Sequence, residues 1–580
     1  MLTAASIFVF LTVAFLILFF SAVPNPALCR LPSRRKGRFR PAGLLILVSV
    51  YSLLAFYRLG ETQSPQSFVP MAERTAVITF QEARQPERLV FFPGVGTGNY
   101  SIEVSDDQEN WFPVTEFYQD HVSVLKWQFL ELSLTEPWKH IRMVCKSGAP
   151  WLGELSAEDA VGNRIPFICN IMELSDEGVI VPGESTFLNS SYFDEIYHAR
   201  TAWEHLNRIW PYEISHPPLG KEILSLGILL FGMTPFGWRF SGTVTGILML
   251  PVMYALLRKL FGGNRIPLLG TTLLGAGFMH YVQTRIATID SYAVFFILLM
   301  FLFMYEWLRE DRLLALGLCG LFFGLGAACK WICLYAGAGL ALLWLVCWIN
   351  RLKTGERSLC DLIKNIFWCL LFFILIPALI YYLSYIPYGL AEDCRPFESA
   401  YTKLVFDNQL FMFNYHAQIV AEHPYSSRWY QWLLDIRPIL YYLQYYSDGT
   451  RVSFGAFVNP LICWGGLIAL LFLLFCAIFR RDRLAAFLLI AWLSGILPWI
   501  FISRLTFEYH YFASAVFLIP ALCYIFSLME AGTKYAGVLE YSFCGFALLL
   551  FVLFFPALNG IAIDNTLGSK LLGWLPSWPF

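Results

Sequence analysis

Long apolar runs recur along most of this chain, and they constrain its fold more than any other feature. The 580 residues are 57% hydrophobic and 14% charged, with a mean hydropathy of +0.57, which is too much apolar surface for a soluble protein to bury. A bilayer-spanning helix needs about 20 apolar residues, so we predict a polytopic α-helical membrane protein with about twelve transmembrane helices. The predicted spans are residues 1–21, 42–57, 238–258, 266–281, 289–307, 312–329, 333–350, 366–385, 458–479, 484–502, 510–529 and 537–557.

Basic residues cluster in alternate loops between these spans, and such loops stay in the cytoplasm. The clusters are Arg30, Arg34, Arg35, Lys36, Arg38 and Arg40; Arg258, Lys259 and Arg265; Arg309 and Arg312; Arg351, Lys353 and Arg357; Arg480, Arg481 and Arg483; and Lys534. Residues 1–58 are therefore predicted to form two spans around a basic cytoplasmic loop, the first being an uncleaved helix because it lacks a basic start and a cleavage site. The predicted external segments are 192–236, 282–289, 386–457, 503–510 and the tail 561–580. This pattern predicts a multi-pass protein of the plasma membrane, or of the endoplasmic reticulum in a eukaryote.

Residues 60–180 interrupt the membrane pattern and predict an external β-sandwich. Short alternating runs occur at 75–80, 89–92, 100–105 and 140–144, and glycines and aspartates bound them. The stretches 100–111, 138–144 and 153–159 resemble the discoidin-like, or coagulation-factor C-type, sandwich. That fold often serves as a carbohydrate-binding module, and a spacer or partner-docking domain is the alternative interpretation.

Two neighbouring acids, Asp194 and Glu195, begin the stretch 192–221, which lies against the membrane without lying inside it. Carboxylates at a bilayer surface are costly to desolvate, so they are candidates for function. We expect Asp194 to act as a catalytic base. His198 lies one helical turn away on the same face and is positioned to orient it.

Five basic residues break the positive-inside rule because they fall on the predicted external side: Lys221, Arg239, Arg285, Lys330 and Arg504. Each alone suits a local ion pair, and Arg285 with Asp290 is the obvious candidate for one. Together they favour an anionic ligand such as a lipid phosphate. Net charge is −1, which argues against a nucleic-acid partner.

Several motifs resemble those of the protein O-mannosyltransferase family, and the resemblance covers about residues 190–560. They are FDEIYH (193–198), HPPLGK (216–221), WRFSG (238–242), RIATID (285–290), HPYSSRW (423–429), NP (459–460) and RLTFEYHY (504–511). The resemblance implies a GT-C glycosyltransferase body that uses dolichyl- or polyprenyl-phosphate mannose. It places the family's acidic pair on Asp194 and Glu195 and its intramembrane arginine on Arg239. The MIR domain of eukaryotic members is missing, a sandwich precedes the acidic pair, and one N-terminal span is extra, so the acceptor stays open between a protein and a glycan.

The resemblance further implies transfer with inversion, because the donor is β-linked and the family's products are α-linked. Such a displacement needs a base for the acceptor hydroxyl, assigned to Asp194, and cations for the leaving phosphate. Glu195 is expected to orient the acceptor. Phosphate binding is assigned first to Arg504 and Lys330, then to Lys221, Arg239 and Arg285. The residues expected to shape the acceptor site are His198, His216, His423, Tyr425 and His510.

Metal ligands at recognisable spacing are missing from the sequence, so no metal is predicted, although dependence on Mg²⁺ stays open. The expected partners are the lipid-linked sugar, a protein or glycan acceptor and membrane lipids, with no prediction of oligomeric state. One alternative is a GT-C transferase acting on a glycan, a lipid or a cell-wall polymer. Alternatives from other classes are a lipid or sugar transporter, which usually carries repeats and midplane charges, and a non-catalytic sugar sensor.

Overall fold

The computed structural model describes residues 4–24, 41–418 and 422–580. The chain divides into two compact units, described separately below. The helical unit comprises Met1–Tyr57, Glu213–Glu222 and Gly242–Phe580, and the β-rich unit comprises Arg58–Tyr212 and Ile223–Ser241. The basic cluster predicted at residues 30–40 lies outside the described residues.

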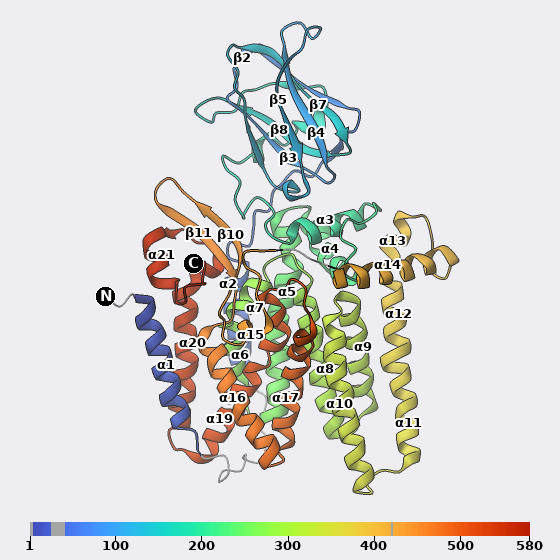
Figure 1. Cartoon of the computed structure of the whole chain (residues 1–580), viewed down its shortest axis with the longest axis vertical. Coiled ribbons are helices and arrows are strands. Elements are labelled where there is room, and N and C mark those ends of the chain that lie inside the picture. Colours follow the sequence, from blue (N-terminus) through green and yellow to red (C-terminus); the bar gives the residue numbers. More distant parts are fainter. Residues whose placement is uncertain (1–3, 25–40, 419–421) are drawn as a thin grey trace. The chain divides into compact units, whose positions relative to one another are not determined.

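Within the described residues, eight helices are long and apolar enough to cross a membrane (Figure 1). They are α1 (Ala4–Ser21), α5 (Pro235–Phe261), α8 (Asp290–Glu310), α10 (Ile332–Lys353), the continuous stretch Leu359–Ala391 that contains α11 (Leu359–Leu370), α12 (Ile376–Leu383) and α13 (Ile386–Ala391), α16 (Pro460–Phe479), the stretch Arg483–Phe501 that begins with α17 (Arg483–Ile496), and α20 (Ala536–Asn559). A ninth span results if Glu508–Ala515 and α19 (Leu518–Gly532), which meet at 41°, are counted as one. The polytopic helical fold is thus confirmed.

The described residues do not reach the expected number of about twelve spans, because three of the predicted spans are short or broken. Helices α2 (Ala42–Phe56) and α9 (Leu313–Cys329) are apolar but have only 15 and 17 residues. The predicted span 266–281 is broken into α6 (Arg265–Gly275) and α7 (Phe278–Gln283). Gly277 between them is extended, at φ −75° and ψ 117°, so the helix cannot continue through it.

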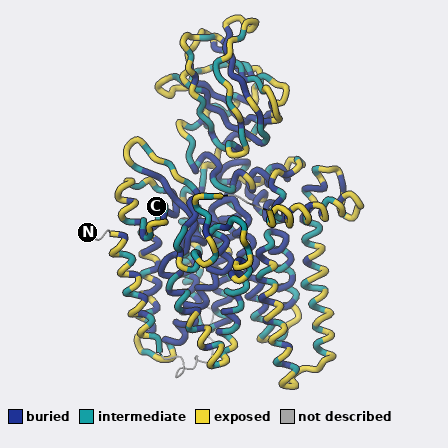
Figure 2. The backbone as a smooth tube through the Cα atoms, in the orientation of Figure 1, coloured by how far each residue is buried: buried dark blue, intermediate teal, exposed yellow. Residues whose placement is uncertain are grey.

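Burial within the helical unit fits a membrane environment (Figure 2). Buried residues line the facing sides of the inner helices, such as α8 and α19. Helix α11, by contrast, has no buried residue, and its apolar side chains Leu359, Ile363 and Phe367 are all exposed. An apolar surface of this kind is suited to lipid rather than to water.

The basic loops gather at one end of the helical unit, because ion pairs join them. These pairs are Lys259–Glu306 (2.7 Å), Arg265–Glu530 (2.6 Å), Arg312–Glu306 (2.9 Å) and Arg351–Asp311 (2.8 Å). Helix α8 ends among them at Glu310, and it begins at Asp290, beside Lys330. Its 21 residues span about 31 Å at 1.5 Å per residue, so Lys330 lies at the opposite end of the unit from the basic loops.

The segment 386–457, expected to be a loop, is largely ordered into regular elements. It contains α14 (Ser399–Gln418), the short α15 (Trp429–Trp432) and an antiparallel hairpin of β10 (Ile439–Tyr445) and β11 (Thr450–Ala456). The tail supplies a third strand, β12 (Ile563–Asp564), followed by α21 (Asn565–Leu572). Aromatic residues and short polar runs concealed this structure from a search for long apolar periods.

Two antiparallel sheets form the core of the β-rich unit. The first has the order β1 (Val69–Pro70), β8 (Trp151–Glu158), β3 (Arg88–Pro93), β6 (Gln128–Glu131), and the second β5 (Phe112–Gln119), β4 (Gly98–Ser105), β7 (Trp138–Gly148), β2 (Thr75–Arg84), β9 (Ile168–Cys169). Phe91 and Leu155 of the first sheet share one hydrophobic core with Ile102 and Ile141 of the second. The four strands expected from alternation fall within β2, β3, β4 and β7. The likeness to discoidin-like domains, and the side of the membrane on which the sheets lie, stay predictions.

Candidate active site

The HPPLGK segment forms a loop that Glu213 and Lys221 hold closed before α4 (Leu219–Phe231). The Lys221 ammonium, 0% exposed, donates to the carbonyls of Glu213 and His216, both at 2.9 Å, and lies 2.5 Å from Glu213 Oε2. The other carboxylate oxygen of Glu213 lies 3.0 Å from His216 Nδ1. Pro217 and Pro218 have no N–H to donate, so this ion pair supplies the contacts that fix the loop. Lys221 thus holds the loop in place, and its reserve assignment to a lipid phosphate stays a prediction.

A cavity of about 470 Å³ opens beside this loop in the helical unit. Its lining includes His216, Lys330, Trp331, His416 and Arg504. Lys330 lies in the extended connection between α9 and α10, and its Nζ is 2.8 Å from Asp290 Oδ1 and 5.6 Å from the centroid of the Tyr509 ring. We refer to this space as the small cavity.

Arg504 contributes positive charge to the small cavity without a carboxylate partner among the described residues. Its Nη1 donates to the Leu505 carbonyl at 3.4 Å, and the side chain is half-buried. Lys330, by contrast, is held in place by Asp290. The small cavity therefore presents two cations, of which only one is compensated, and this arrangement suits a ligand that carries negative charge.

His416 on α14 lines the same cavity as a neutral imidazole. Burial, together with the positive charge of Arg504 and Lys330, lowers its pKa to about 4. Its Nε2–H donates to the Ser215 carbonyl at 2.8 Å, which leaves Nδ1 as an acceptor with no hydrogen-bond partner in the described part of the chain. The pKa of His216 is also lowered by burial, although Glu213 opposes this effect. Both histidines can thus accept a hydrogen bond but add no charge near neutral pH.

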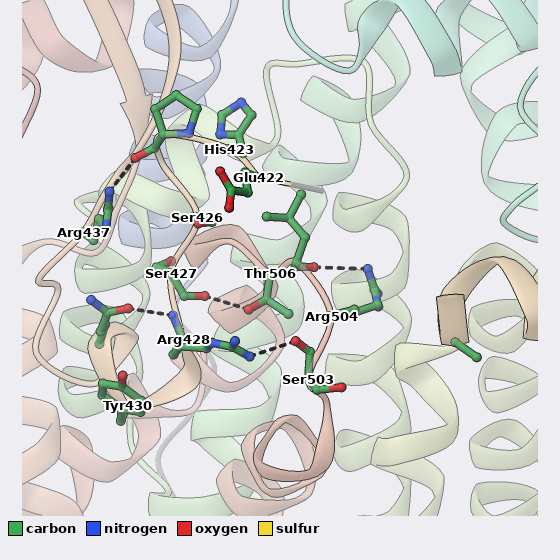
Figure 3. Close-up of a pocket in the computed structure, with 14 residues that line it drawn as sticks. Glu422, His423, Ser426, Ser427, Arg428, Tyr430, Arg437, Ser503, Arg504 and Thr506 are labelled. Atoms are coloured by element: carbon green, nitrogen blue, oxygen red, sulfur yellow. Dashed lines mark hydrogen bonds between the residues drawn. The ribbon is translucent and has the colours of Figure 1, made fainter. Parts of the chain in front are cut away.

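A larger, polar cavity of about 860 Å³ adjoins the small one, because both are lined by Ala417, Ser503 and Arg504 (Figure 3). Its walls come from the HPYSSRW segment and from the start of RLTFEYHY. Thr506 Oγ1 donates to the Ser427 carbonyl at 2.6 Å, and the Ser427 N–H donates back to the Thr506 carbonyl at 2.9 Å. These bonds fix the two segments to each other, and we call the space between them the large cavity.

Two further arginines, Arg428 and Arg437, line the large cavity. Arg428 donates to the Ser503 carbonyl at 3.0 Å, and Arg437 donates to the Pro424 carbonyl at 2.6 Å (Figure 3). His423 lies on the same wall, with its ring edge-on to Phe507 at 5.0 Å. The two cavities together offer room for a charged headgroup and for a second substrate.

Three other predicted site residues line neither cavity. Arg285 donates to the carbonyls of Ala55 and Tyr57, at 2.9 and 2.7 Å, where α2 ends, while its expected partner Asp290 pairs with Lys330. The Tyr425 N–H donates to His423 Nδ1 at 3.2 Å, so Tyr425 supports His423. His510 is buried between aromatic rings, 4.5 Å from Trp499 and 4.4 Å from Tyr509. Arg285 thus makes a helix-end contact and His510 packs in an aromatic core, and their expected site roles stay predictions.

The acidic pair lies in the β-rich unit, at the start of α3 (Glu195–Leu206). Glu195 is 0% exposed and accepts two hydrogen bonds of 2.7 Å from Arg239, whose guanidinium also donates to the carbonyls of Leu59 and Ser190. This bidentate pair occupies both side chains. The pair is a structural contact in this part of the chain, and the expected roles of Glu195 at the acceptor and of Arg239 at the phosphate stay predictions.

Asp194 is half-buried and occupies the N-cap position of α3, without a side-chain capping hydrogen bond. Its carbonyl accepts the N–H of His198 at 3.1 Å, as expected for the first helical turn. The expected role of Asp194 as catalytic base stays a prediction.

Sequence reasoning did not predict Glu213, His416, Arg428 or Ser503 as site residues. Glu213 carried one usable signal, an acid three residues before the histidine of HPPLGK. The other residues could not be found from spacing, because only folding brings 416, 428 and 503 to two adjoining cavities.

Comparisons with known proteins show which family the chain resembles. Residues 215–382 match the family model for dolichyl-phosphate-mannose-protein mannosyltransferase, and residues 401–578 match that for the C-terminal four TMM region of protein-O-mannosyltransferase. The chain is 25% identical over 472 residues to the polyprenol-phosphate-mannose–protein mannosyltransferase of Corynebacterium glutamicum, covering 68% of this chain and 89% of that one. It is 24% identical over 463 residues to the enzyme of the same description from Mycobacterium tuberculosis, covering 68% and 88%.

Among solved structures, the fold resembles the S. cerevisiae protein O-mannosyltransferase Pmt1-Pmt2 complex bound to the sugar donor. The TM-score is 0.59 at 12% sequence identity, with 67% of this chain and 89% of that chain covered. The two family models together take in the HPPLGK loop, Lys330, His416 and Arg504, which line the small cavity; Arg504 also lines the large one. The chain belongs to the protein O-mannosyltransferase family of GT-C glycosyltransferases.

Proposed function

We propose that this chain transfers mannose from a polyprenyl phosphate to a hydroxyl group of a protein. The observation that carries the proposal is the small cavity, where Lys330 and Arg504 converge beside a second cavity large enough for an acceptor. The curated relatives, of which this chain spans close to nine-tenths, are described as acting on polyprenol-phosphate-mannose and protein.

The leaving group of this reaction is a lipid phosphate, whose charge grows as the bond to the sugar breaks. Lys330 and Arg504 are placed to stabilise that charge, and Asp290 keeps the Lys330 ammonium aimed into the cavity. The unpartnered Nδ1 of His416 is suited to accept a hydrogen bond from a sugar hydroxyl. None of these steps needs a metal ion to neutralise the phosphate.

The acceptor side of the reaction needs a base. In the proposed displacement, the acceptor oxygen attacks C1 of mannose, a base takes its proton, and the C1–O bond to phosphate breaks with inversion. The family resemblance, and not the placement of the two units, assigns this base to Asp194. Glu195 is paired with Arg239, whereas Asp194 is half-buried just before α3 begins.

The reaction is proposed to occur on the extracytoplasmic face. Lys330 lies at the end of the helical unit opposite the basic loops, and such loops are retained in the cytoplasm. A transferase that glycosylates a glycan or a lipid would use the same two cavities, so the acceptor decides between these functions.

Purified protein in nanodiscs, supplied with polyprenyl-phosphate mannose and a panel of acceptors, tests the proposal. Serine- and threonine-containing peptides should gain one hexose, located on a hydroxyl side chain by mass spectrometry, whereas the same peptides with alanine at those positions should gain none. Hexose transfer to oligosaccharide or lipid acceptors, with unmodified peptides, would instead establish the alternative.

A further inference from the structure

A cluster of three carboxylates in the β-rich unit has no counterpart in the transfer site. One oxygen from each of Glu154, Asp176 and Glu177 lies within 4.8 Å of the other two. Glu154 belongs to β8, and the other two residues lie between the short helical turns η2 (Met172–Leu174) and η3 (Gly178–Ile180). We propose that these three residues bind a divalent cation, and specifically Ca²⁺.

Glu154 is the residue that distinguishes this cluster from an ordinary acidic surface. Its side chain is 0% exposed, and its Oε1 has no hydrogen-bond partner among the described residues. Its Oε2 accepts only the backbone N–H of Glu177, at 3.1 Å. A buried carboxylate oxygen that lacks a donor is costly, and a bound cation would satisfy it.

The other buried glutamates of the two sheets show how this fold otherwise compensates such groups. Glu158, four residues further along the same strand, accepts a 2.6 Å hydrogen bond from Arg88. Glu103 is bound by Arg142 and by Lys146, the latter at 2.9 Å. Glu154 faces acids where these two face cations, and a bound cation would supply the missing positive charge.

The groups around Glu154 support this reading. Burial is the main cause that raises its pKa to about 8, and the nearby charges that add to the rise are Asp176 and Glu177. The pKa of Glu177 is also raised, by burial and by Asp176, while the Gln66 N–H donates to Glu177 at 2.9 Å. A cation bound between the three carboxylates would offset this repulsion among like charges.

The ligand chemistry favours Ca²⁺. All three donors are carboxylate oxygens, which are hard ligands, and Ca²⁺ binds such oxygens at about 2.3–2.6 Å. Two oxygens on one Ca²⁺ can therefore be as much as about 5 Å apart, which accommodates this cluster, whereas Mg²⁺ at about 2.1 Å would draw them closer. Asp176 is exposed, so an ion can reach the site from solvent, and waters can complete its coordination.

Calcium binding to the purified full chain, first stripped with a chelator, tests the site. Equilibrium dialysis with radioactive Ca²⁺ should detect one site per chain, and Mg²⁺ should compete weakly. Glu154→Gln should weaken this binding at least about tenfold, and Asp176→Asn, which alters an exposed residue, should weaken it as well.

Glu173→Gln is the matched control, because it removes one exposed acid from the same segment outside the cluster and should leave binding unchanged. Thermal unfolding in chelator shows whether each variant is folded. The inference is overturned if the wild-type chain binds no Ca²⁺ at millimolar concentration, or if Glu154→Gln and Asp176→Asn both bind it as the wild type does. These measurements do not depend on mannose transfer, so a failure of calcium binding can be distinguished from a failure of the proposed function.

Discussion

Replacing Arg504 with glutamine is expected to weaken binding of the lipid-linked donor while leaving the fold intact. Arg504 lines both cavities, is half-buried, and has no carboxylate partner in the described residues. Its removal therefore leaves no buried acid unpaired. Glutamine keeps an N–H donor near the same position, so the change reports mainly on the charge.

The expected magnitude follows from the position of the side chain. Two unit charges about 4 Å apart attract by about 4 kcal/mol at the effective dielectric constant of about 20 that applies near a protein surface. Exchange with water reduces the net value of such a charged hydrogen bond to about 1.5–3 kcal/mol. Donor affinity should accordingly fall by about 10- to 150-fold.

Titration of polyprenyl phosphate and polyprenyl-phosphate mannose into protein in nanodiscs measures this loss. Arg428→Gln is the matched control, since Arg428 is exposed, lines only the large cavity and already donates to the Ser503 carbonyl. Its donor affinity should stay close to that of the wild type. Salt should weaken wild-type binding more than that of Arg504→Gln. Equal losses in the two variants, or no loss in Arg504→Gln, would refute the placement of the phosphate.

Three further predictions follow from paired or neutral side chains. Lys330→Met should weaken donor binding and lower the unfolding free energy by about 3–5 kcal/mol, because it leaves Asp290 buried and unpaired. Adding Asp290→Asn should restore stability in thermal unfolding but should not restore affinity in donor titration. Glu195→Gln should destabilise the chain by about 3–5 kcal/mol, because it leaves the Arg239 charge buried and unpaired. Adding Arg239→Met should recover thermal stability. If the stability losses of the two single variants simply add in the double variant, the pairing is contradicted. The folded chain keeps the pKa of His416 near 4, below its ordinary value. As the pH drops from about 6.5 towards 4, the unfolded chain binds a proton that the folded chain excludes, so the free energy of unfolding should fall. His416→Gln should reduce this slope in unfolding titrations, and an unchanged slope would place the effect elsewhere.

The membrane body could be predicted from the sequence because its helices appear there as long apolar runs. Helices α8, α10, α16 and α20 all fall where apolar runs were marked. The break between α6 and α7 could not be anticipated, since it depends on the extended conformation of Gly277 within an apolar run. The elements in 386–457 were missed because their residues pack against the rest of the helical unit without an apolar period of their own.

The site was predictable in its charges but not in its pairings. Cations on the external side marked Lys330 and Arg504, and both line the small cavity. The same rule also marked three cations that have partners within the chain. Lys221 pairs with Glu213 in a loop, Arg239 pairs with the buried Glu195, and Arg285 donates to a carbonyl at the end of α2. A sequence shows that a charge is out of place, but only the fold shows which partner compensates it.

The most direct test of the proposed mechanism is Asp194→Asn, with donor binding and mannose transfer measured on one preparation. General-base catalysis contributes about 10²- to 10⁴-fold, so transfer to a peptide should fall by that factor while donor affinity is unchanged. Transfer at close to the wild-type rate in a variant that binds donor normally would contradict the account, because the acceptor proton would then be taken by another group.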